Sequence, residues 1–274
     1  MIYKIIQPSS HLQAFVKDYL LLHFAFDKSA AVPVKPFPAN TLQCLVFYVK
    51  GFVTAYDPSS GISKIFPQTA INGSITSRLD FKVSHDYLLL SVGFYPGALS
   101  KFLRLPLTEF VNERVDAEAI LNPEIHEVQE RMVNATSYEN IVQIAEEYLW
   151  KRIQNLKIDF HPIDKVAQLI SENPNAFTIE KMAGYACLSI SQFERRFVLL
   201  TGITPKFFAR INRFYKAYQL KDQNPNMDWL RIAIEAGYYD YQHLVKDFKQ
   251  FSNVTPHSLL NAQAHSPERI LGIA

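Results

Sequence analysis

Two short stretches of this 274-residue chain carry polar and basic side chains that can read the edges of nucleic-acid bases. In the first stretch, the planar guanidinium of Arg195 can donate to O6 and N7 of one guanine. Its neighbour Glu194 can accept from a cytosine amino group, or it can act only by repelling phosphate. In the second stretch, Gln242 can pair with adenine, and Lys246 can reach a guanine or a phosphate. Such contacts select a sequence only if defined elements hold them in place.

The first stretch lies on a predicted helix that begins at Ser189. Ser189 and Gln192 form an S-x-x-Q capping box, in which each side chain accepts from a backbone N–H that the first turn would leave unpaired. Apolar residues then recur at steps of three and four, which predicts one buried stripe with the polar residues facing elsewhere. The stripe consists of Ile190, Phe193, Phe197 and Leu200. A shorter helix that opens at Thr178 precedes this one.

A second copy of the pattern begins at Asp228, a favourable N-cap residue. Gly237 suits the left-handed conformation that ends a helix and turns the chain, and a new helix starts near Asp240. Its predicted inward residues are Leu244, Phe248 and Phe251. We align Ser191 with Tyr241 as corresponding early positions, 241 − 191 = 50 residues apart. The chain therefore predicts two helix-turn-helix units.

Each unit is followed by a Thr-Pro pair, which sets an N-cap before a proline at the first helical position. Thr204-Pro205 opens an amphipathic helix that reaches about Leu220, and Thr255-Pro256 repeats this opener after the second unit. A stiff connecting helix would hold the two reading helices in a fixed relation. They could then enter successive major-groove segments on one face of a duplex, about 34 Å apart.

These residues resemble the DNA-binding domain of the AraC/XylS family of bacterial transcription regulators. The resemblance is carried by Met182-Ala183, Leu188-Ser189 through Arg195-Arg196-Phe197, Thr201 through Pro205, Ile232-Ala233 through Gly237-Tyr238, and Phe248-Lys249 through Val254-Thr255-Pro256. By position it implies base-reading residues at Ser191, Glu194, Arg195, Tyr241, Gln242, His243 and Lys246. The predicted phosphate contacts are Arg196, Lys206, Arg210 and Lys249.

The chain departs from the family pattern at three places. Tyr238 stands where a phenylalanine is usual, and we expect it in the core, with Tyr239 and Tyr241 at the surface near the DNA backbone. Asn253 replaces the usual glycine. Leu259-Leu260 replaces an aromatic residue followed by arginine, which puts one phosphate contact in doubt.

The N-terminal part alternates extended apolar runs with turn signals. The runs 19–26, 42–49 and 87–94 read as buried strands, which predicts an antiparallel β-sandwich or barrel. We predict a short helix over residues 8–19, with Leu12, Phe15 and Val16 facing inward.

Predicted helices follow the strands, at residues 98–103, 123–133 and 136–155. The last is capped by Thr136, and its apolar stripe either packs on the strands or forms a subunit contact. This stripe consists of Ile141, Ile144, Ala145 and Tyr148. The segment from Val92 to Leu121 resembles a domain type found ahead of AraC-like DNA-binding domains. That resemblance implies a β-rich regulatory domain and names no effector.

The predicted fold class is α+β, with an N-terminal antiparallel β-sandwich or barrel followed by helices. A C-terminal all-α domain of two helix-turn-helix units joined by a linker helix completes it. We place the regulatory domain at residues 1–157 and the DNA-binding domain at 158–265, with a linker at 155–161 and a helix opening at Pro162. The tail after about Ala262 is expected to be loosely held.

Composition excludes several classes of protein. The net charge of +2 permits nucleic-acid binding without demanding it, and no apolar run reaches the roughly 20 residues of a membrane span. Cys44 and Cys187 are expected to be buried, reduced thiols. The chain contains no G-x-S-x-G motif and no phosphate-binding glycine loop, and the N-terminal histidines His11, His23, His85 and His126 have no partners at metal-ligand spacing. We therefore predict no catalysis, no metal and no cofactor.

The sequence as a whole predicts a cytoplasmic, sequence-specific transcription regulator that binds double-stranded promoter DNA. Its N-terminal domain is expected to sense a small-molecule effector of unknown identity or to mediate self-association as a homodimer. A contact with RNA polymerase is a further expected partnership. The alternative is a DNA-binding protein whose N-terminal domain is a protein-interaction module without a small ligand. An enzyme with an attached DNA-binding domain is the remaining alternative.

Overall fold

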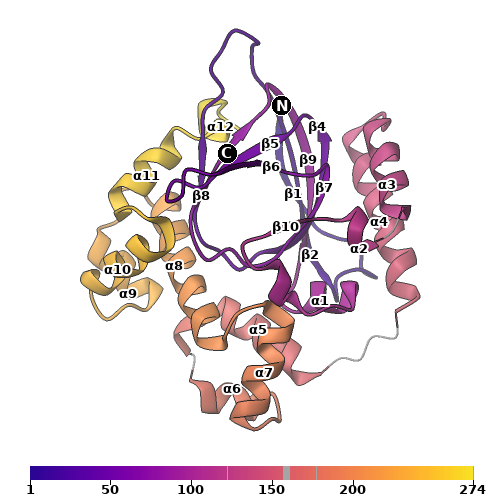
Figure 1. The fold of residues 1–274 in the computed structure, drawn as a ribbon. Helices are drawn as coiled ribbons and strands as arrows, with labels where there is room; N and C mark the ends of the chain where they lie inside the picture. The colour runs from indigo at the N-terminus through magenta and orange to yellow at the C-terminus, as the bar shows by residue number, and fades with distance from the viewer. Residues whose placement is uncertain (122, 157–160, 177, 274) are drawn as a thin grey trace.

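The computed structural model describes residues 1–121, 123–156, 161–176 and 178–273, and it joins a ring of strands to a set of helices (Figure 1). Within the described residues, the strands form two antiparallel sheets, ordered β1-β2-β9-β4-β7-β10 and β3-β8-β5-β6. The strands are β1 (Ile2–Ile6), β2 (Val16–Ala25), β3 (Lys35–Phe37), β4 (Gln43–Lys50), β5 (Val53–Tyr56), β6 (Ser63–Ile65), β7 (Thr69–Asn72), β8 (Leu79–Val83), β9 (Asp86–Phe94) and β10 (Arg114–Asp116). The three predicted buried strands are confirmed as β2, β4 and β9.

The two faces of the larger sheet serve two different cores. Because successive side chains on a strand point to opposite faces, Leu45 and Phe47 of β4 pack outward against helices, whereas Val46 and Tyr48 point inward between the sheets. The side chains of β9 alternate between the same two cores. Burial on both faces explains why these strands read as nearly continuous apolar runs.

Helices cover the outer face of the six-stranded sheet. They are α1 (Ala98–Leu103), the 3-10 turn η1 (Leu107–Phe110), α2 (Glu118–Leu121), α3 (Glu124–Val133) and α4 (Tyr138–Gln154). The apolar stripe of α4 lies in one core with sheet residues such as Leu45, so packing on the strands is the observed alternative. The cap of α4 is Ser137, which accepts from the Asn140 N–H, and not Thr136 as predicted.

The predicted helix over residues 8–19 is wrong. The chain makes tight turns there, with the N–H of Leu12 donating to Ser9 O and that of Phe15 to Leu12 O. It enters β2 at Val16, where pairing with β9 begins. Sheet pairing therefore takes the residues that a helix would need, although Leu12, Phe15 and Val16 are buried as expected.

Eight α-helices and one 3-10 turn make up the described C-terminal half. They are α5 (Pro162–Glu172), η2 (Pro174–Ala176), α6 (Ile179–Tyr185), α7 (Ile190–Thr201), α8 (Pro205–Gln223), α9 (Trp229–Ala236), α10 (Tyr241–Ser252), α11 (Pro256–Ala264) and α12 (Pro267–Ile270). The predicted boundary at 157/158, inside the linker at 155–161, falls outside the described residues. No helix in the described ranges has both the length and the apolar character needed to cross a membrane.

The C-terminal tail is held, contrary to prediction. Glu268 is 3% exposed and forms an ion pair with Lys35 of β3, and Arg269 binds Asp222 of α8 at 2.8 Å. Leu271 and Ile273 pack against the core between the two sheets. The tail therefore joins the connecting helix α8 to the β-rich half.

Candidate functional site

Helices α6 and α7 form the first helix-turn-helix unit. Thr178 caps α6, and the predicted capping box of α7 is present, with Gln192 N–H on Ser189 Oγ at 3.3 Å and Ser189 N–H on Gln192 Oε1 at 3.2 Å. Phe193 and Phe197 are fully buried, as expected. Ile190 is instead exposed, because it is the first residue of the helix and lies at the edge of the packed face.

Helices α9 and α10 form the second unit. Asp228 caps α9 through the N–H groups of Leu230 and Arg231, and Gly237 ends that helix with φ at 86°. Asp240 caps α10, and the N–H of His243 lowers the pKa of this carboxyl by donating to it at 2.8 Å. The imidazole of His243 also lies 3.0 Å from Asp240, so part of its hydrogen-bonding capacity is used inside the helix.

The number of residues between corresponding positions of the two units is not constant. The capping residues Thr178 and Asp228 are 228 − 178 = 50 residues apart, whereas the reading helices begin 241 − 190 = 51 residues apart. The difference is one additional residue in the second turn. Tyr239 in that turn is 91% exposed. Ser191 therefore corresponds to Gln242, and the predicted alignment of Ser191 with Tyr241 is wrong by one position.

This register places two basic side chains at equivalent positions, since 246 − 195 = 51. Arg195 and Lys246 are both exposed, and neither has a hydrogen bond or ion pair to another described residue. Glu194 and Gln242 are also exposed. The remaining predicted base-reading residues, Ser191, Tyr241 and His243, lie on the exposed sides of the same two helices.

The predicted phosphate contacts fall into two groups. Lys206 and Lys249 are exposed. The guanidinium of Arg196 lies 3.1 Å from His161 Nε2, and that of Arg210 donates to Asp247 at 2.6 Å and to Gln250 at 2.7 Å. Arg210 is therefore engaged within the protein.

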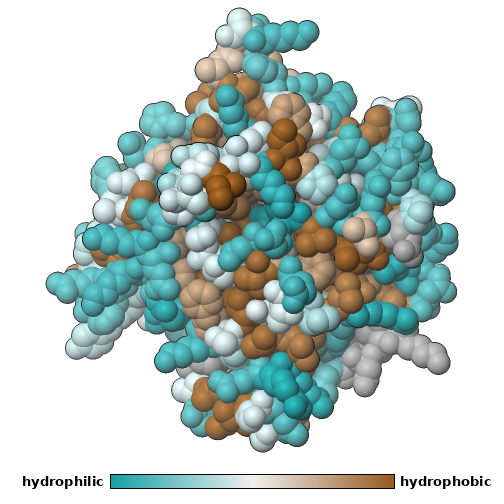
Figure 2. All heavy atoms as spheres, in the orientation of Figure 1, coloured by the Kyte–Doolittle hydropathy of each residue, from teal (hydrophilic) through white to brown (hydrophobic). Residues whose placement is uncertain are grey.

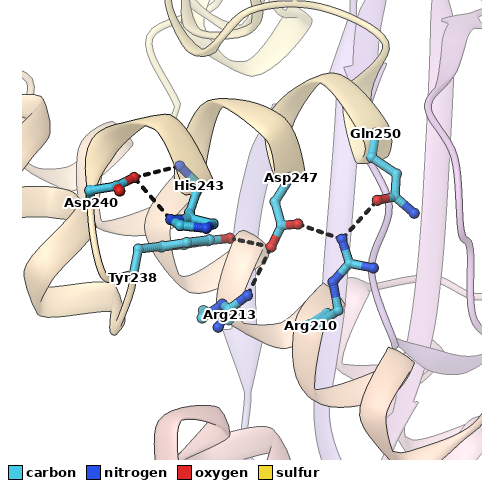
Figure 3. A network of polar contacts seen from close by, with 7 residues as sticks. All are labelled: Arg210, Arg213, Tyr238, Asp240, His243, Asp247 and Gln250. Carbon is cyan, nitrogen blue, oxygen red and sulfur yellow. Dashed lines mark hydrogen bonds and ion pairs between the residues drawn. The ribbon is translucent and has the colours of Figure 1, made fainter.

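A buried carboxylate at the centre of the second unit was missed by sequence reasoning. Asp247 of α10 accepts from Arg210, from Arg213 at 3.2 Å and from the hydroxyl of Tyr238 at 3.0 Å (Figure 3). Burial, and then the neighbouring carboxylate, raise the pKa of Tyr238. The available signal was the place of Asp247 beside Phe248, on the side of the helix that faces inward.

The departures from the family pattern now have physical explanations. Tyr238 is buried, as expected, and its hydroxyl finds a partner in Asp247. Asn253 adopts φ of 59° at the end of α10, where asparagine is the usual substitute for glycine. Leu259 is fully buried and belongs to the core of the helical half. Cys187, predicted to be buried, is exposed and takes φ of 55° where the second unit has Gly237.

A cavity of about 460 Å³ lies between the two sheets and opens toward α8 and the C-terminal tail. Figure 2 shows hydrophobic side chains gathered over the middle of this face, where Figure 1 views the ring of strands end-on. Apolar residues line most of its interior, among them Phe24, Val46 and Leu89. Burial raises the pKa of Cys44 on its wall to about 11, which keeps that thiol neutral.

A buried guanidinium lines this apolar interior. Arg114 of β10 is 6% exposed, lines the cavity and lies over the ring of Phe66 at 5.4 Å. Its guanidinium donates to the carbonyl of Glu113 at 3.1 Å and has no carboxylate within ion-pair distance in the described residues. Burial lowers the pKa of this guanidinium from its usual value, although nearby groups oppose this shift. A buried guanidinium without a carboxylate is well placed to bind an anion.

Two family models match the chain. Residues 182–262 match a family described as "Helix-turn-helix domain", and residues 4–116 match "Domain of unknown function (DUF6597)". No curated protein sequence matches the chain. Within the described residues, no three His, Cys, Asp or Glu side chains gather in a way that could hold a metal ion.

Several solved structures are distantly similar. ToxT from Vibrio cholerae O395 is 14% identical over 89% of this chain and 98% of its own, with a TM-score of 0.47. Unsaturated fatty acid bound ToxT from Vibrio cholerae strain SCE256 is 12% identical over 88% and 94%, also with 0.47. The AraC-like transcriptional activator CuxR is 10% identical over 79% and 86%, with 0.29. Similarity at this level carries no inference about ligand or mechanism.

Proposed function

Because the chain belongs to the AraC/XylS family of DNA-binding transcription regulators, we propose that α7 and α10 read bases in two successive major-groove segments. The family assignment also indicates that the protein is not an enzyme. The observation that carries this proposal is the equivalence of Arg195 and Lys246. Both are exposed cations on the same turn of matching helices, and both lack partners among the described residues. The apolar face of each helix fixes the direction of its polar face.

Individual roles follow from side-chain chemistry. Arg195 contacts guanine through its two parallel donors, and Gln242 pairs with adenine. Ser191, Glu194, Tyr241, His243 and Lys246 complete the proposed base-reading set. Lys206 and Lys249 contact phosphates, and so does Arg196 once it leaves His161. For Arg210 the contact would compete with Asp247, so we propose it as the weakest of the four.

We propose that the cavity between the sheets is a sensor site for an amphipathic anion. An apolar body would fill the interior, and its anionic group would meet the guanidinium of Arg114. The observation that favours a small ligand over a protein-interaction module is the concave apolar space with this buried cation inside it. Residues 1–157 would then form the sensor domain and residues 158–265 the DNA-binding domain. Self-association, a polymerase contact and a cytoplasmic location stay predictions.

The DNA-reading proposal is tested with a matched pair of variants, Arg195→Ala and Lys249→Ala, on a selected target and on sequences that differ from it by one base pair. Arg195→Ala should relax preference at one position and weaken binding to the target by about 1–3 kcal/mol. Lys249→Ala should weaken binding to every sequence alike and flatten the salt dependence. Equal losses on every sequence for both variants would contradict the role given to Arg195.

A further inference from the structure

The C-terminal ends of both reading helices rest on the β-rich half. The hydroxyl of Ser74 donates to the carbonyl of Thr201, the last residue of α7, at 3.0 Å. The N–H of Ala39 donates to the carbonyl of Phe251, near the end of α10, also at 3.0 Å. The last carbonyls of a helix have no partner within it. The β-rich half therefore supplies donors to equivalent ends of the two helices.

Further contacts strengthen this attachment. The side-chain amide of Gln43 donates to Leu200 O at 3.4 Å and accepts from the Gly97 N–H at 3.0 Å. The hydroxyl of Thr41 donates to Asn212 of α8 at 3.0 Å. Ala39 is itself part of the apolar core of the helical half. Helix α8 packs against α5 and α7 on one side and against α9 and α10 on the other, so it connects the two helix-turn-helix units. The contacts from the β-rich half to α7 and α10 connect the same two units by a second route.

The same segment lines the cavity with its other face. Alternate residues of the chain between β3 and β4 serve two different neighbours. Pro38, Asn40, Leu42 and Cys44 line the cavity, whereas Ala39, Thr41 and Gln43 contact the helices. Residues 72, 73 and 75 also line it, next to Ser74. Backbone hydrogen bonds of 2.9 and 2.8 Å between Asn40 and Ile75 join the two pieces.

The fit beneath α7 is tight. A Cβ placed on Gly202, just after α7, would lie 2.5 Å from Val111 and 2.7 Å from the carbonyl of Leu107. A Cβ on Gly73 would lie 2.5 Å from the carbonyl of Phe110. Packed contacts of this kind transmit a displacement rather than absorb it. A ligand pressing on Asn40 or Ile75 would therefore move the donors that hold the reading helices.

We propose that residues 38–44 and 72–75, the coupling segment, transmit occupancy of the cavity to the relative placement of α7 and α10. This proposal rests on the sensor role proposed above for the cavity. Ser74, Thr41, Gln43 and the backbone of Ala39 are positioning groups for DNA reading, although none of them lies on the exposed face of a reading helix. Coupling of this kind is reciprocal, so DNA binding changes ligand affinity by the same factor as ligand changes DNA affinity.

The test measures the distance between the two units in the full chain without DNA. Cys187 lies exposed in the first turn and Cys44 is buried, so a spin label on Cys187 pairs with one on Tyr239→Cys in the second turn. The double-labelled parent should give one narrow distance distribution. Ser74→Ala and Thr41→Val, alone and combined, should widen it. The matched control is Ser100→Ala, which removes a hydroxyl bonded to Leu105 O within the β-rich half and should change nothing.

The ligand arm uses 8-anilinonaphthalene-1-sulfonate, an apolar anion, as the probe. It should bind at one saturable site, lose affinity at least tenfold in Arg114→Met, and move or widen the distance distribution of the parent. It should also change DNA affinity at least fivefold in the parent and Ser100→Ala, and less than twofold in the Ser74→Ala/Thr41→Val double variant. Circular dichroism checks that each variant is folded, and either single variant suffices if the double variant is not.

The outcomes separate the two proposals. Saturable, Arg114-dependent probe binding with an unchanged distance distribution overturns the coupling and leaves the sensor site standing. No Arg114-dependent binding overturns the sensor site and the coupling with it. A distribution as narrow in the folded Ser74→Ala and Thr41→Val variants as in the parent also overturns the coupling. None of these readings depends on which bases Arg195 contacts.

Discussion

The two helix-turn-helix units share one backbone plan and use their charged residues differently. In α7, Arg195 and Arg196 both lie on the exposed face. In α10 the equivalent pair is Lys246, which is exposed, and Asp247, which is buried and binds Arg210 and Arg213 of α8. The first unit keeps its basic groups at the surface, whereas the second unit has at the equivalent position a carboxylate that is paired with two arginines of the connecting helix α8. Equivalent positions in a repeated motif therefore need not have equivalent roles.

The largest effect expected from this difference is on stability. Asp247→Ala would remove the carboxylate partner of two partly buried guanidinium groups and the acceptor of the Tyr238 hydroxyl, and would leave Arg210 with Gln250 alone. Loss of one partner of a buried ion pair costs 3–5 kcal/mol, and because both arginines are about one-third exposed we expect about 2–3 kcal/mol. Urea unfolding of the full chain measures this. Arg196→Ala, at the equivalent position of the first unit, should cost less than about 0.5 kcal/mol. Similar losses of stability for the two variants would contradict the different roles given to Asp247 and Arg196.

The turns differ as well, and Gly237→Ala should give the next largest effect. Gly237 adopts φ of 86°, and an added Cβ would lie 1.9 Å from the side chain of Asn175. A left-handed conformation costs a residue other than glycine about 1–2 kcal/mol, and the exposed Asn175 can move aside. We therefore expect a loss of about 1–2 kcal/mol in thermal or urea unfolding. An unchanged midpoint would mean that this turn tolerates a side chain.

The reverse substitution in the first unit, Cys187→Gly, should stabilise. Cys187 already has φ of 55°, so glycine relieves that strain while making the unfolded chain more flexible. The balance favours the variant by about 0.5 kcal/mol, read as a small rise in the unfolding midpoint. Cys187→Ser, which keeps a Cβ, is the control and should leave stability near that of the parent.

The smallest effect concerns the tail that joins the connecting helix α8 to the β-rich half. Burial raises the pKa of Glu268, but the charge of Lys35 and its hydrogen bond lower it further, so the net direction is downward. A carboxyl with a lowered pKa stabilises the folded state above its unfolded value, near pH 4, and this contribution is lost as the pH falls through the folded value. The protection factors of the amides at residues 268–271, which remove the intrinsic pH dependence of hydrogen exchange, should therefore fall on acidification. Glu268→Gln should show no such pH dependence, and an equal response in both proteins would contradict this account.

Local features of the fold were predictable from sequence, and long-range ones were not. The caps at Ser189, Thr204 and Asp228 involve neighbouring residues, so composition and spacing were enough to find them. The ion pair that holds the tail joins residues 233 positions apart, and no residue near Glu268 in the sequence indicates that its partner is Lys35. The predicted helix over residues 8–19 was wrong because the end of this segment pairs with β9, which is far away in the sequence.

Within the candidate site, the exposed polar faces followed directly from the apolar stripes. The register did not, because the additional residue in the second turn shifts α10 by one position while leaving its own pattern intact. Asp247 was hidden for a different reason. A carboxylate on a buried face looks unfavourable in sequence, and only the approach of Arg210, Arg213 and Tyr238 makes it stable there.

Selection of bound sequences from a random DNA pool tests the central claim most directly. The parent protein should recover a target with two preferred blocks whose centres are about one helical turn, or 10 base pairs, apart. Arg195→Ala should relax preference in one block and Lys246→Ala in the other. Recovery of a single block, or relaxation of the same block by both variants, would contradict the claim that α7 and α10 each read DNA.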